Sequence, residues 1–359
     1  MKSKFNPLIR LIFCWLFFIA NQNLTPALAQ VDAAFVTKPT SAESAPTPGA
    51  NTSSADLKNK HWPQHTVKIL VGFPPGSTPD MIARTLAENL SKSLGQSVIV
   101  ENHIGVSGNL AAQQVARAQD DHTLGILING NLTTAKLLYP SIEFNPLKDF
   151  TPLSLIADSP LVLVAPVALP SGKAFFKAAL GKGSQWNYGS VGTGSMAHLA
   201  MEAIKASNPG FEPVHIPYPG NPNVMNALMA GEIQMALVPI GVAAPLIRSE
   251  RIQAVGLIGG KSILAPSLAP LSEVGVKVGS TELQVWDALV GPKSLSREAQ
   301  LRLKAELGAL RASTELRNQL FNQGWIFRGS TDVALKNIIN SEYATMSEII
   351  GRNKIQINP

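Results

Sequence analysis

The stretch VKILVGFPPGSTPDMIARTLAENL, residues 67–90, decides the fold of this chain. Val67–Val71 is a short apolar run typical of a buried strand, and from Asp80 the apolar residues recur at helical spacing. The turn between them, Gly72–Pro79, carries two hydroxyl side chains and no basic one. A strand, a turn and a helix start in succession predict a βα loop, where the backbone N–H groups of the helix start favour an anion. We expect the chain to bind a small anion rather than transform it.

The same order of elements continues along the chain. Val98–Asn102 is a second predicted strand, the turn Ile104–Gly108 opens a helix over Asn109–Ala118, and Thr123–Ile128 is a third strand. This βαβαβ order implies a parallel sheet with right-handed crossovers, and ligands on such sheets lie beyond the carboxyl ends of the strands. Asn129 follows the third strand and is therefore expected to face the ligand.

A second unit is predicted after an exit at Pro166–Pro170, and a tail rich in helices follows it. The N-terminal signals of that tail include Ser313 and the pair Thr331-Asp332, which are residue types preferred before a helix. Beyond residue 150 we expect strands at 153–157, 161–166, 186–190, 214–218, 233–238, 254–258 and 283–289, and helices at 196–207, 221–230, 243–249, 296–312, 314–323 and 331–352.

The second unit has its own Gly-rich helix start, Gly192–Ser195. With Ala197 it matches the G-x-G-x-x-A pattern of dinucleotide sites, but no acid stands at the next strand end to hold a ribose. We interpret the turn instead as an anion-binding helix start that offers N–H groups and the hydroxyls of Thr193 and Ser195. His198 lies one turn into the helix, where a packing or loop-orienting role is favoured over that of a general base.

The N-terminus has the features of an export signal. A basic start precedes the apolar core Leu11–Ala20, and the small residues Ala27-Leu28-Ala29 form a cleavage site, so that 1–29 is a predicted signal peptide. Its removal takes away Cys14, the only cysteine, and export without disulfides suits a bacterial periplasm. A retained anchor is the alternative. Residues 30–61, rich in Ala, Ser, Thr and Pro, predict a disordered leader.

The composition excludes several classes of protein. The net charge of +6 comes partly from the signal, and no run of Lys and Arg resembles a nucleic-acid footprint. Charged residues make up only 15% of the chain, which favours buried parallel sheets and an α/β fold. No G-x-S-x-G elbow occurs, and His61 and His65 are separated by Pro63. We therefore expect no catalytic residue, metal or cofactor.

Several motifs together resemble one known family. Phe73–Gly76 with Asp80 and Ile82-Ala83-Arg84 resembles a signature of the tripartite tricarboxylate transporter receptors, the Bug-type periplasmic solute-binding proteins. The similarity spans nearly all of the mature chain and includes Val98–Asn102, Gly105, Gly108-Asn109, Leu138–Pro140, Pro146–Phe150, Asn187–Ser190, His198–Ala200 and Val214–Tyr218.

The resemblance implies a two-domain α/β periplasmic binding protein of the Venus flytrap kind, type II-like, with parallel-rich sheets. Such a receptor captures a small organic carboxylate by hinge closure and passes it to membrane permease subunits. The receptor itself is expected to be a monomer. We place domain 1 at 62–165 with 280–359, domain 2 at 166–279, and hinges near Ala165–Val167 and Gly279–Leu283. The resemblance implies ligand contacts from Phe73, Gly76, Ser77, Thr78 and Asp80 on one side and from Thr193, Gly194, Ser195 and His198 on the other.

The chain departs from the family pattern at four positions. Ser77 replaces a loop glycine, Pro79 stands where a hydroxyl is usual, and Pro219 and Pro239 replace polar residues of later turns. Ligand identity is therefore open. Two alternatives remain: an exported hydrolase of small carboxylate esters that depends on Ser195, and an orphan receptor that acts as a sensor.

Overall fold

The computed structural model describes residues 61–278, 283–352 and 355 of the 359-residue chain. The predicted signal peptide, the leader up to residue 60 and the predicted hinge segment 279–282 lie outside these residues. Within them, no helix has both the length and the apolar character that a membrane crossing requires.

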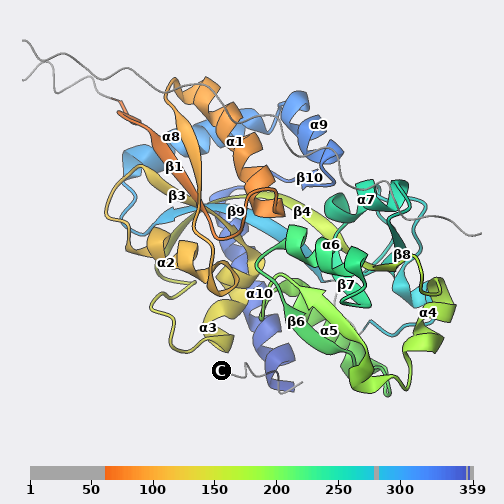
Figure 1. The fold of residues 1–359 in the computed structure, drawn as a ribbon. Coiled ribbons are helices and arrows are strands. Elements are labelled where there is room, and N and C mark those ends of the chain that lie inside the picture. Colours follow the sequence, from red (N-terminus) through yellow and green to blue (C-terminus); the bar gives the residue numbers. More distant parts are fainter. Residues whose placement is uncertain (1–60, 279–282, 353–354, 356–359) are drawn as a thin grey trace, which may run out of the picture. The chain divides into compact units, whose positions relative to one another are not determined.

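The described strands form one ten-stranded sheet in the order β2-β1-β3-β9-β4-β7-β5-β6, with β8 and β10 also paired to β4 (Figure 1). The pairs of β1 with β2 and β3, and of β5 with β6 and β7, are parallel, as the alternating sequence pattern predicted. The strands are β1 (Val67–Val71), β2 (Val98–Asn102), β3 (Thr123–Ile128), β4 (Phe150–Pro166), β5 (Asn187–Ser190), β6 (Val214–Pro217), β7 (Met235–Pro239), β8 (Ile252–Leu257), β9 (Gln284–Pro292) and β10 (Ile326–Phe327).

The helices begin close to their predicted starts. Ser296 and Ser313 cap α8 and α9 by accepting hydrogen bonds from backbone N–H groups, and Gly95 ends α1 in the left-handed conformation. The helices are α1 (Thr78–Leu94), α2 (Asn109–Arg117), α3 (Ala135–Leu138), α4 (Gly172–Ala179), α5 (Met196–Ser207), α6 (Asn221–Ala230), α7 (Ile240–Arg248), α8 (Arg297–Leu310), α9 (Thr314–Asn322) and α10 (Asp332–Arg352), with short turns η1 (Val106–Gly108), η2 (Gly130–Thr134), η3 (Gly183–Gln185) and η4 (Leu271–Val274).

Strand β4 links two halves of the sheet. Up to Pro160 it pairs with β9, and from Leu161 it pairs with β7 and β8. We call the half with β1–β3, β9 and β10 lobe 1 and the half with β5–β8 lobe 2. The sequence predicted two separate strands here, which is wrong, because pairing with β9 continues through the polar residues Asp158 and Ser159. The change of partner lies a few residues before the predicted boundary at 165, and the division into domains stays a prediction.

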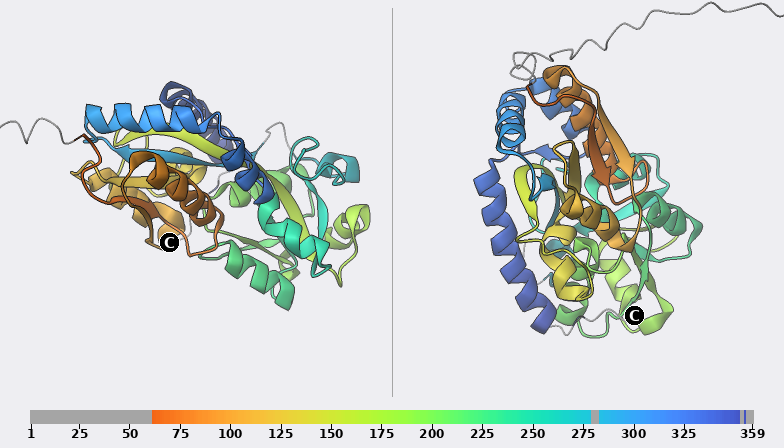
Figure 2. Two further views of the ribbon diagram at one scale, coloured as in Figure 1. Left: turned by 90° about the horizontal axis from the view of Figure 1, so that it is seen from above. Right: turned by 90° about the vertical axis from the view of Figure 1, so that its left-hand side faces the viewer.

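Helices cover both faces of the sheet in lobe 1 (Figure 2). Helices α1, α8 and α9 contribute to one core and α2 and α10 to the other. Helix α10 also reaches lobe 2, because Leu335 and Ile339 pack in a lobe 1 core whereas Met346 packs in a lobe 2 core. It therefore runs along the two lobes at the back of the view in Figure 1.

Two predicted features differ from the structure. The expected polar loop at Asn129–Asn131 is the start of η2, where the Thr133 hydroxyl donates to the Asn129 carbonyl at 2.8 Å and Thr134 Oγ1 lies 2.9 Å from the Gly130 carbonyl. The Thr133 bond satisfies a backbone group that the loop interpretation left open. Helix α4 was not predicted at all.

Candidate functional site

The loop between β1 and α1, Gly72–Ser77, which we call loop 1, is held by Asp80. Its carboxylate accepts from the Gly76 N–H at 2.9 Å, from Arg84 Nη2 at 2.8 Å and from Asn102 Nδ2 at 2.8 Å. Burial of Asp80 opposes its ionisation, but these hydrogen bonds outweigh burial and lower its pKa. Asp80 is therefore an ionised anchor that fixes Gly76, whose φ of 78° suits glycine.

Ser77 is the N-cap residue of α1, yet its hydroxyl does not cap the helix. Its backbone is extended, with φ −71° and ψ 162°, and its side chain makes no capping hydrogen bond. The Oγ atom is buried and has no hydrogen-bond partner among the described residues. A buried hydroxyl without a partner costs about 1–3 kcal/mol. Such an atom at a helix N-terminus is a candidate contact for a ligand.

The second predicted loop, Gly192–Ser195, which we call loop 2, is held in a similar way by His198. The His198 Nδ1 atom accepts from the Gly194 N–H at 3.1 Å, and Ser195 Oγ accepts from the His198 N–H at 3.4 Å. Burial lowers the pKa of His198 to about 4. The ring is therefore neutral near pH 7, and Nδ1 can accept a hydrogen bond. His198 is thus a loop-orienting residue, as the sequence suggested.

A second histidine, His215, supports loop 2 through Ser190 and by stacking on His198. His215 Nε2 lies 2.6 Å from Ser190 Oγ, and the Gly192 N–H donates to that oxygen at 3.2 Å. The His215 ring stacks on His198 with the centroids 4.2 Å apart. Burial lowers the pKa of His215 to about 3, which makes it a weak base. The pair of Ser190 and His215 therefore fits a structural role better than that of a nucleophile and base.

The expectation that the amides of both loops are unpaired is wrong for Gly76 and Gly194. Each N–H donates to a side chain four residues further along, Asp80 in loop 1 and His198 in loop 2. The sequence pattern showed the glycines. It did not show that the side chain four residues later, on the first turn of the helix, reaches back to the glycine N–H. Direct ligand contact by Asp80 or His198 stays a prediction.

The loops contact the opposite lobes. Asn221 Nδ2 of lobe 2 donates to the Thr78 hydroxyl at 3.3 Å. In loop 2, the Thr193 and Gly194 carbonyls accept from Tyr139 Oη at 3.0 Å and Thr134 Oγ1 at 2.8 Å of lobe 1. The lobes therefore contact each other at the start of α1, directly after loop 1, and at loop 2.

Only a small cavity remains where loop 2 meets lobe 1. Its volume is about 10 Å³, enough for one water molecule at most. Of the ten predicted site residues, Thr193, Gly194 and Ser195 line it. Phe73 instead packs in the lobe 1 core. This cavity thus does not bring all the predicted residues together, and it is too small for a ligand larger than water.

Asn129 points toward β9 and α10. Its Nδ2 atom donates to the Gln284 carbonyl at 3.0 Å and to Glu342 Oε1 at 3.1 Å, while its Oδ1 has no partner in the described part of the chain. Its binding role stays a prediction.

Sequence reasoning missed Asp287. It is fully buried in β9, its Oδ1 has no partner within the described residues, and burial raises its pKa well above the usual range. Its pairing partner in β3, Ile128, lines the small cavity. The signal in the sequence was a lone acid in the apolar run Val285–Val290.

No group of three or more His, Cys, Asp or Glu side chains arranged for a metal ion occurs among residues 61–278, 283–352 and 355. The fold and the two loops define a two-lobed α/β binding protein. The model of the family described as "tripartite tricarboxylate transporter family receptor" matches residues 82–353, and the chain belongs to that family. This confirms the resemblance drawn from the sequence.

The similar proteins agree with this assignment. A Bordetella pertussis protein of the UPF0065 group is 33% identical over 260 residues, 70% of this chain and 78% of its own. An R. palustris protein solved with adipate is 28% identical, covers 82% of this chain and 99% of its own, and has a TM-score of 0.77. The periplasmic binding protein BugD, 24% identical over 82% of this chain and 99% of its own with a TM-score of 0.76, shows the same fold.

Proposed function

We propose that this receptor captures a small organic carboxylate in the periplasm by closure of its two lobes and passes it, without turnover, to membrane permease subunits. Membership of the tricarboxylate transporter receptor family supports this. So does the R. palustris relative that was solved with adipate. The predicted export signal and the absence of cysteine after its removal suit the periplasm.

The unpaired hydroxyl of Ser77 is the observation that carries the proposal. It lies at the N-terminus of the 17-residue helix α1, where the helix dipole favours negative charge. A carboxylate oxygen would accept from Ser77 Oγ and so remove the cost of the buried, unpaired donor. Arg84 is already paired with Asp80 and so offers no free positive charge to the ligand. The carboxylate would therefore be held by the hydroxyl and the helix N-terminus and not by a basic side chain.

Hydrolysis of carboxylate esters, the alternative from another class, finds less support. The Ser195 hydroxyl accepts from a backbone N–H, and no hydrogen bond joins it to the His198 ring within the described residues. Burial lowers the pKa of His198 to about 4, far from that of an efficient general base at neutral pH. An assay of p-nitrophenyl esters separates the two: turnover that Ser195→Ala abolishes favours the hydrolase.

A growth experiment distinguishes a sensor from a receptor that supplies a transporter. If the receptor supplies permease subunits, deletion of those subunits abolishes growth on the captured carboxylate. If it acts only as a sensor, growth persists while the response to the ligand is lost with the receptor.

The binding class is tested with the mature protein and a panel of acids: adipate, malate, citrate, benzoate, nicotinate and aspartate, each beside its uncharged amide. A bound ligand at about 100 times its Kd stabilises the folded state by about 2.7 kcal/mol and raises the melting temperature. We expect at least one acid to do so and its amide to fail. If no acid shifts the melting temperature and none gives heat on titration, the carboxylate proposal is wrong.

A further inference from the structure

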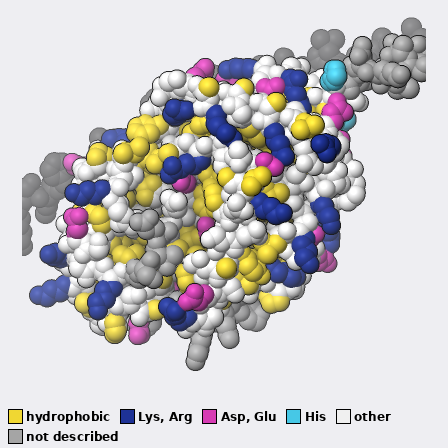
Figure 3. Space-filling view, turned by 180° about the vertical axis from the view of Figure 1, so that it is seen from behind, with side chains coloured by type: hydrophobic (Ala, Val, Ile, Leu, Met, Phe, Trp, Pro, Cys, Tyr) yellow, Lys and Arg dark blue, Asp and Glu magenta, His cyan; other side chains and the backbone are white. Residues whose placement is uncertain are grey.

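A large pocket lies away from both loops, on the side of the sheet that α10 covers. It has a volume of about 590 Å³, within the range of small-molecule sites. Figure 3 shows the face of the molecule that carries α10, with hydrophobic side chains gathered on it. We call it the rear pocket; its walls are Leu155, Asp158, Met196, Leu283, Gln284, Trp286, Arg328, Ser330, Ile338, Ser341, Glu342, Thr345 and Met346.

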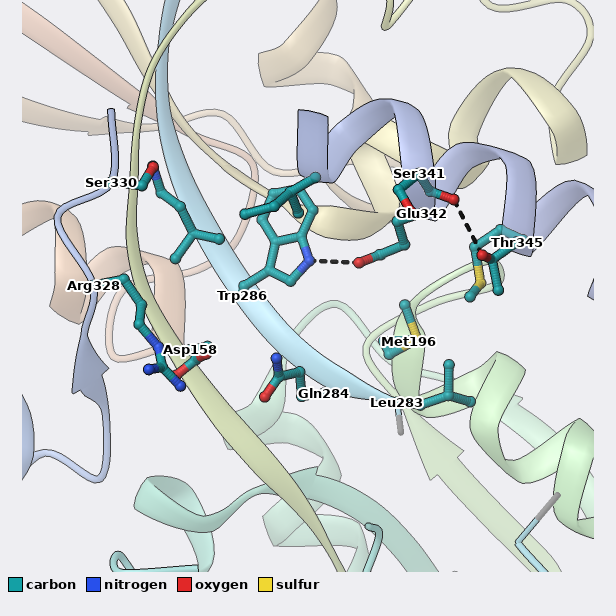
Figure 4. A pocket seen from close by; sticks show the side chains of 13 residues that line it. Asp158, Met196, Leu283, Gln284, Trp286, Arg328, Ser330, Ser341, Glu342 and Thr345 are labelled. Carbon is teal, nitrogen blue, oxygen red and sulfur yellow. Dashed lines mark hydrogen bonds and ion pairs between the residues drawn. The ribbon is translucent and has the colours of Figure 1, made fainter. Parts of the chain in front are cut away.

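The wall of the rear pocket combines apolar and polar side chains, and its apolar part is adaptable. Trp286 of β9 lies between β4 and α10, and Met196 lies on the lobe 2 side (Figure 4). Met346 also lines the pocket and packs in the same lobe 2 core as Met196. Methionine side chains adjust to irregular shapes, and an indole ring offers both a broad apolar surface and a face that attracts cations. The pocket is therefore suited to the apolar body of a small organic molecule.

The charges in the wall favour one sign of ligand. Glu342 accepts hydrogen bonds from Trp286 Nε1 at 2.6 Å and Asn129 Nδ2 at 3.1 Å, both of them neutral donors. No ion pair to Glu342 occurs among the described residues. Its carboxylate thus has hydrogen bonds but no compensating charge.

The other acid of the pocket is already neutralised. Asp158 Oδ2 accepts from Arg328 Nε at 2.8 Å, so that this pair carries no net charge. An anion entering the pocket would meet the uncompensated Glu342, whereas a cation would pair with it.

We propose that the rear pocket is a second binding site, separate from loop 1, for a small organic cation: an amine whose apolar body packs on Trp286 and the methionines and whose ammonium faces Glu342. A cation stabilises the ionised form of this carboxylate. Burial raises the pKa of Glu342 to about 7, and the other charged groups that line the pocket, Asp158 and Arg328, lie at its opposite wall (Figure 4). Amine affinity therefore rises as the pH increases from about 6 to 8, while the amine stays protonated.

Benzylamine and benzyl alcohol are matched probes, because they share an apolar body and differ in charge. Calorimetric titration of the mature protein at pH 8 should show benzylamine binding at least about tenfold more tightly than the alcohol. Glu342→Gln should bring the two affinities together and remove the pH dependence. Its control is Glu348→Gln, since Glu348 pairs with Arg352 on the same helix and is outside the pocket wall.

A blocking variant localises the binding and does not depend on the Glu342 variant being folded. Ser341 is exposed and lines the pocket, so Ser341→Trp should fill its entrance and abolish benzylamine binding. Ser347→Trp, at an exposed position of α10 outside the wall, should leave it unchanged. Ser77→Ala should also leave it unchanged, which keeps this test separate from the carboxylate site. Equal affinity for the amine and the alcohol, retention of binding in Ser341→Trp, or no binding up to about 10 mM would overturn the proposal.

Discussion

Loops 1 and 2 share one construction and differ in a single contact. Each has a glycine with φ near 80°, then an N-cap serine, then a side chain three residues after the serine that accepts from the glycine N–H. In loop 2 the serine hydroxyl is used by its own helix, through the His198 N–H. In loop 1 the Ser77 hydroxyl is buried without a partner. The same design therefore leaves the serine hydroxyl with no hydrogen bond at all in loop 1, whereas in loop 2 the serine oxygen accepts one.

The comparison shows that the side chain holding a loop need not be the one that binds. Asp80 is ionised and already has four donor contacts, from Gly76, from two nitrogens of Arg84 and from Asn102. An acid in that position would repel an anion if it were free, but it stabilises the loop when its charge is paired. Loop 1 can thus hold an anion beside a buried aspartate.

The two anchors should respond differently to acid, which is the largest expected effect. The pKa of His198 is about 4 in the folded protein and 6.5 unfolded, so its contribution is present above pH 6.5 and is lost as the pH falls toward 4. The full difference is about 3 kcal/mol. The pKa of Asp80 is lowered, so its contribution persists until the pH falls below 3.8. Loop 2 should therefore loosen first.

Hydrogen exchange of the Gly76 and Gly194 amides measures this directly. Between pH 6.5 and 4 we expect protection to fall at Gly194 and to hold at Gly76. His198→Asn supplies an acceptor that does not titrate and should reduce the loss, while His215, which also supports loop 2 and has a lowered pKa, accounts for the remainder. Global unfolding is a poorer readout, because Glu342 and Asp287 have raised pKa values and change stability in the opposite sense. If protection from exchange falls equally at the Gly76 and Gly194 amides, the expected difference between the two loops is contradicted.

Removing the acid anchor is the next largest effect. Asp80→Ala leaves the Gly76 N–H without its acceptor, removes one acceptor of Asn102 and takes away the charge partner of Arg84. We expect the free energy of unfolding to fall by about 3 kcal/mol and carboxylate binding to be lost with the loop. Urea unfolding checks the first effect. Glu88→Ala, which removes an exposed ion pair from the same helix, should cost less than about 0.5 kcal/mol.

The capping serine of loop 2 should give a smaller effect. Ser195→Ala removes the acceptor for the His198 N–H and should lower the unfolding free energy by about 1 kcal/mol. Ser313→Ala, at the capped start of α9, is the matched variant and should cost a similar amount. A neutral Ser195→Ala beside a destabilised Ser313→Ala would show that the 3.4 Å contact contributes nothing.

The sequence predicted local structure well where short-range chemistry decides it. The start of α9 after Ser313, the bounds of α5 and α6, and the parallel strands of both lobes follow from capping residues and hydrophobic period. The family motif also directed attention to loop 1, which contains the unpaired hydroxyl of Ser77.

Long-range contacts account for what the sequence could not supply. Glu342 meets Asn129 across 213 positions of the chain, and Trp286 across 56. Neither pattern nor spacing shows that α10 returns to β9 and closes the rear pocket. The continuity of β4 through Asp158 and Pro160 likewise depends on β9, which comes more than a hundred residues later.

The one substitution expected not to lower stability tests the central claim most directly. Ser77→Ala removes a buried hydroxyl that makes no hydrogen bond, so the unfolding free energy should not fall and should rise by up to about 1–3 kcal/mol. Calorimetric titration with the acid found in the carboxylate panel should nevertheless show an affinity at least about tenfold lower than wild type, which corresponds to about 1.4 kcal/mol. Ser195→Ala should lose stability but less of this affinity. If Ser77→Ala binds the acid as tightly as the wild-type protein does, the hydroxyl of loop 1 is not the ligand contact and the account is wrong.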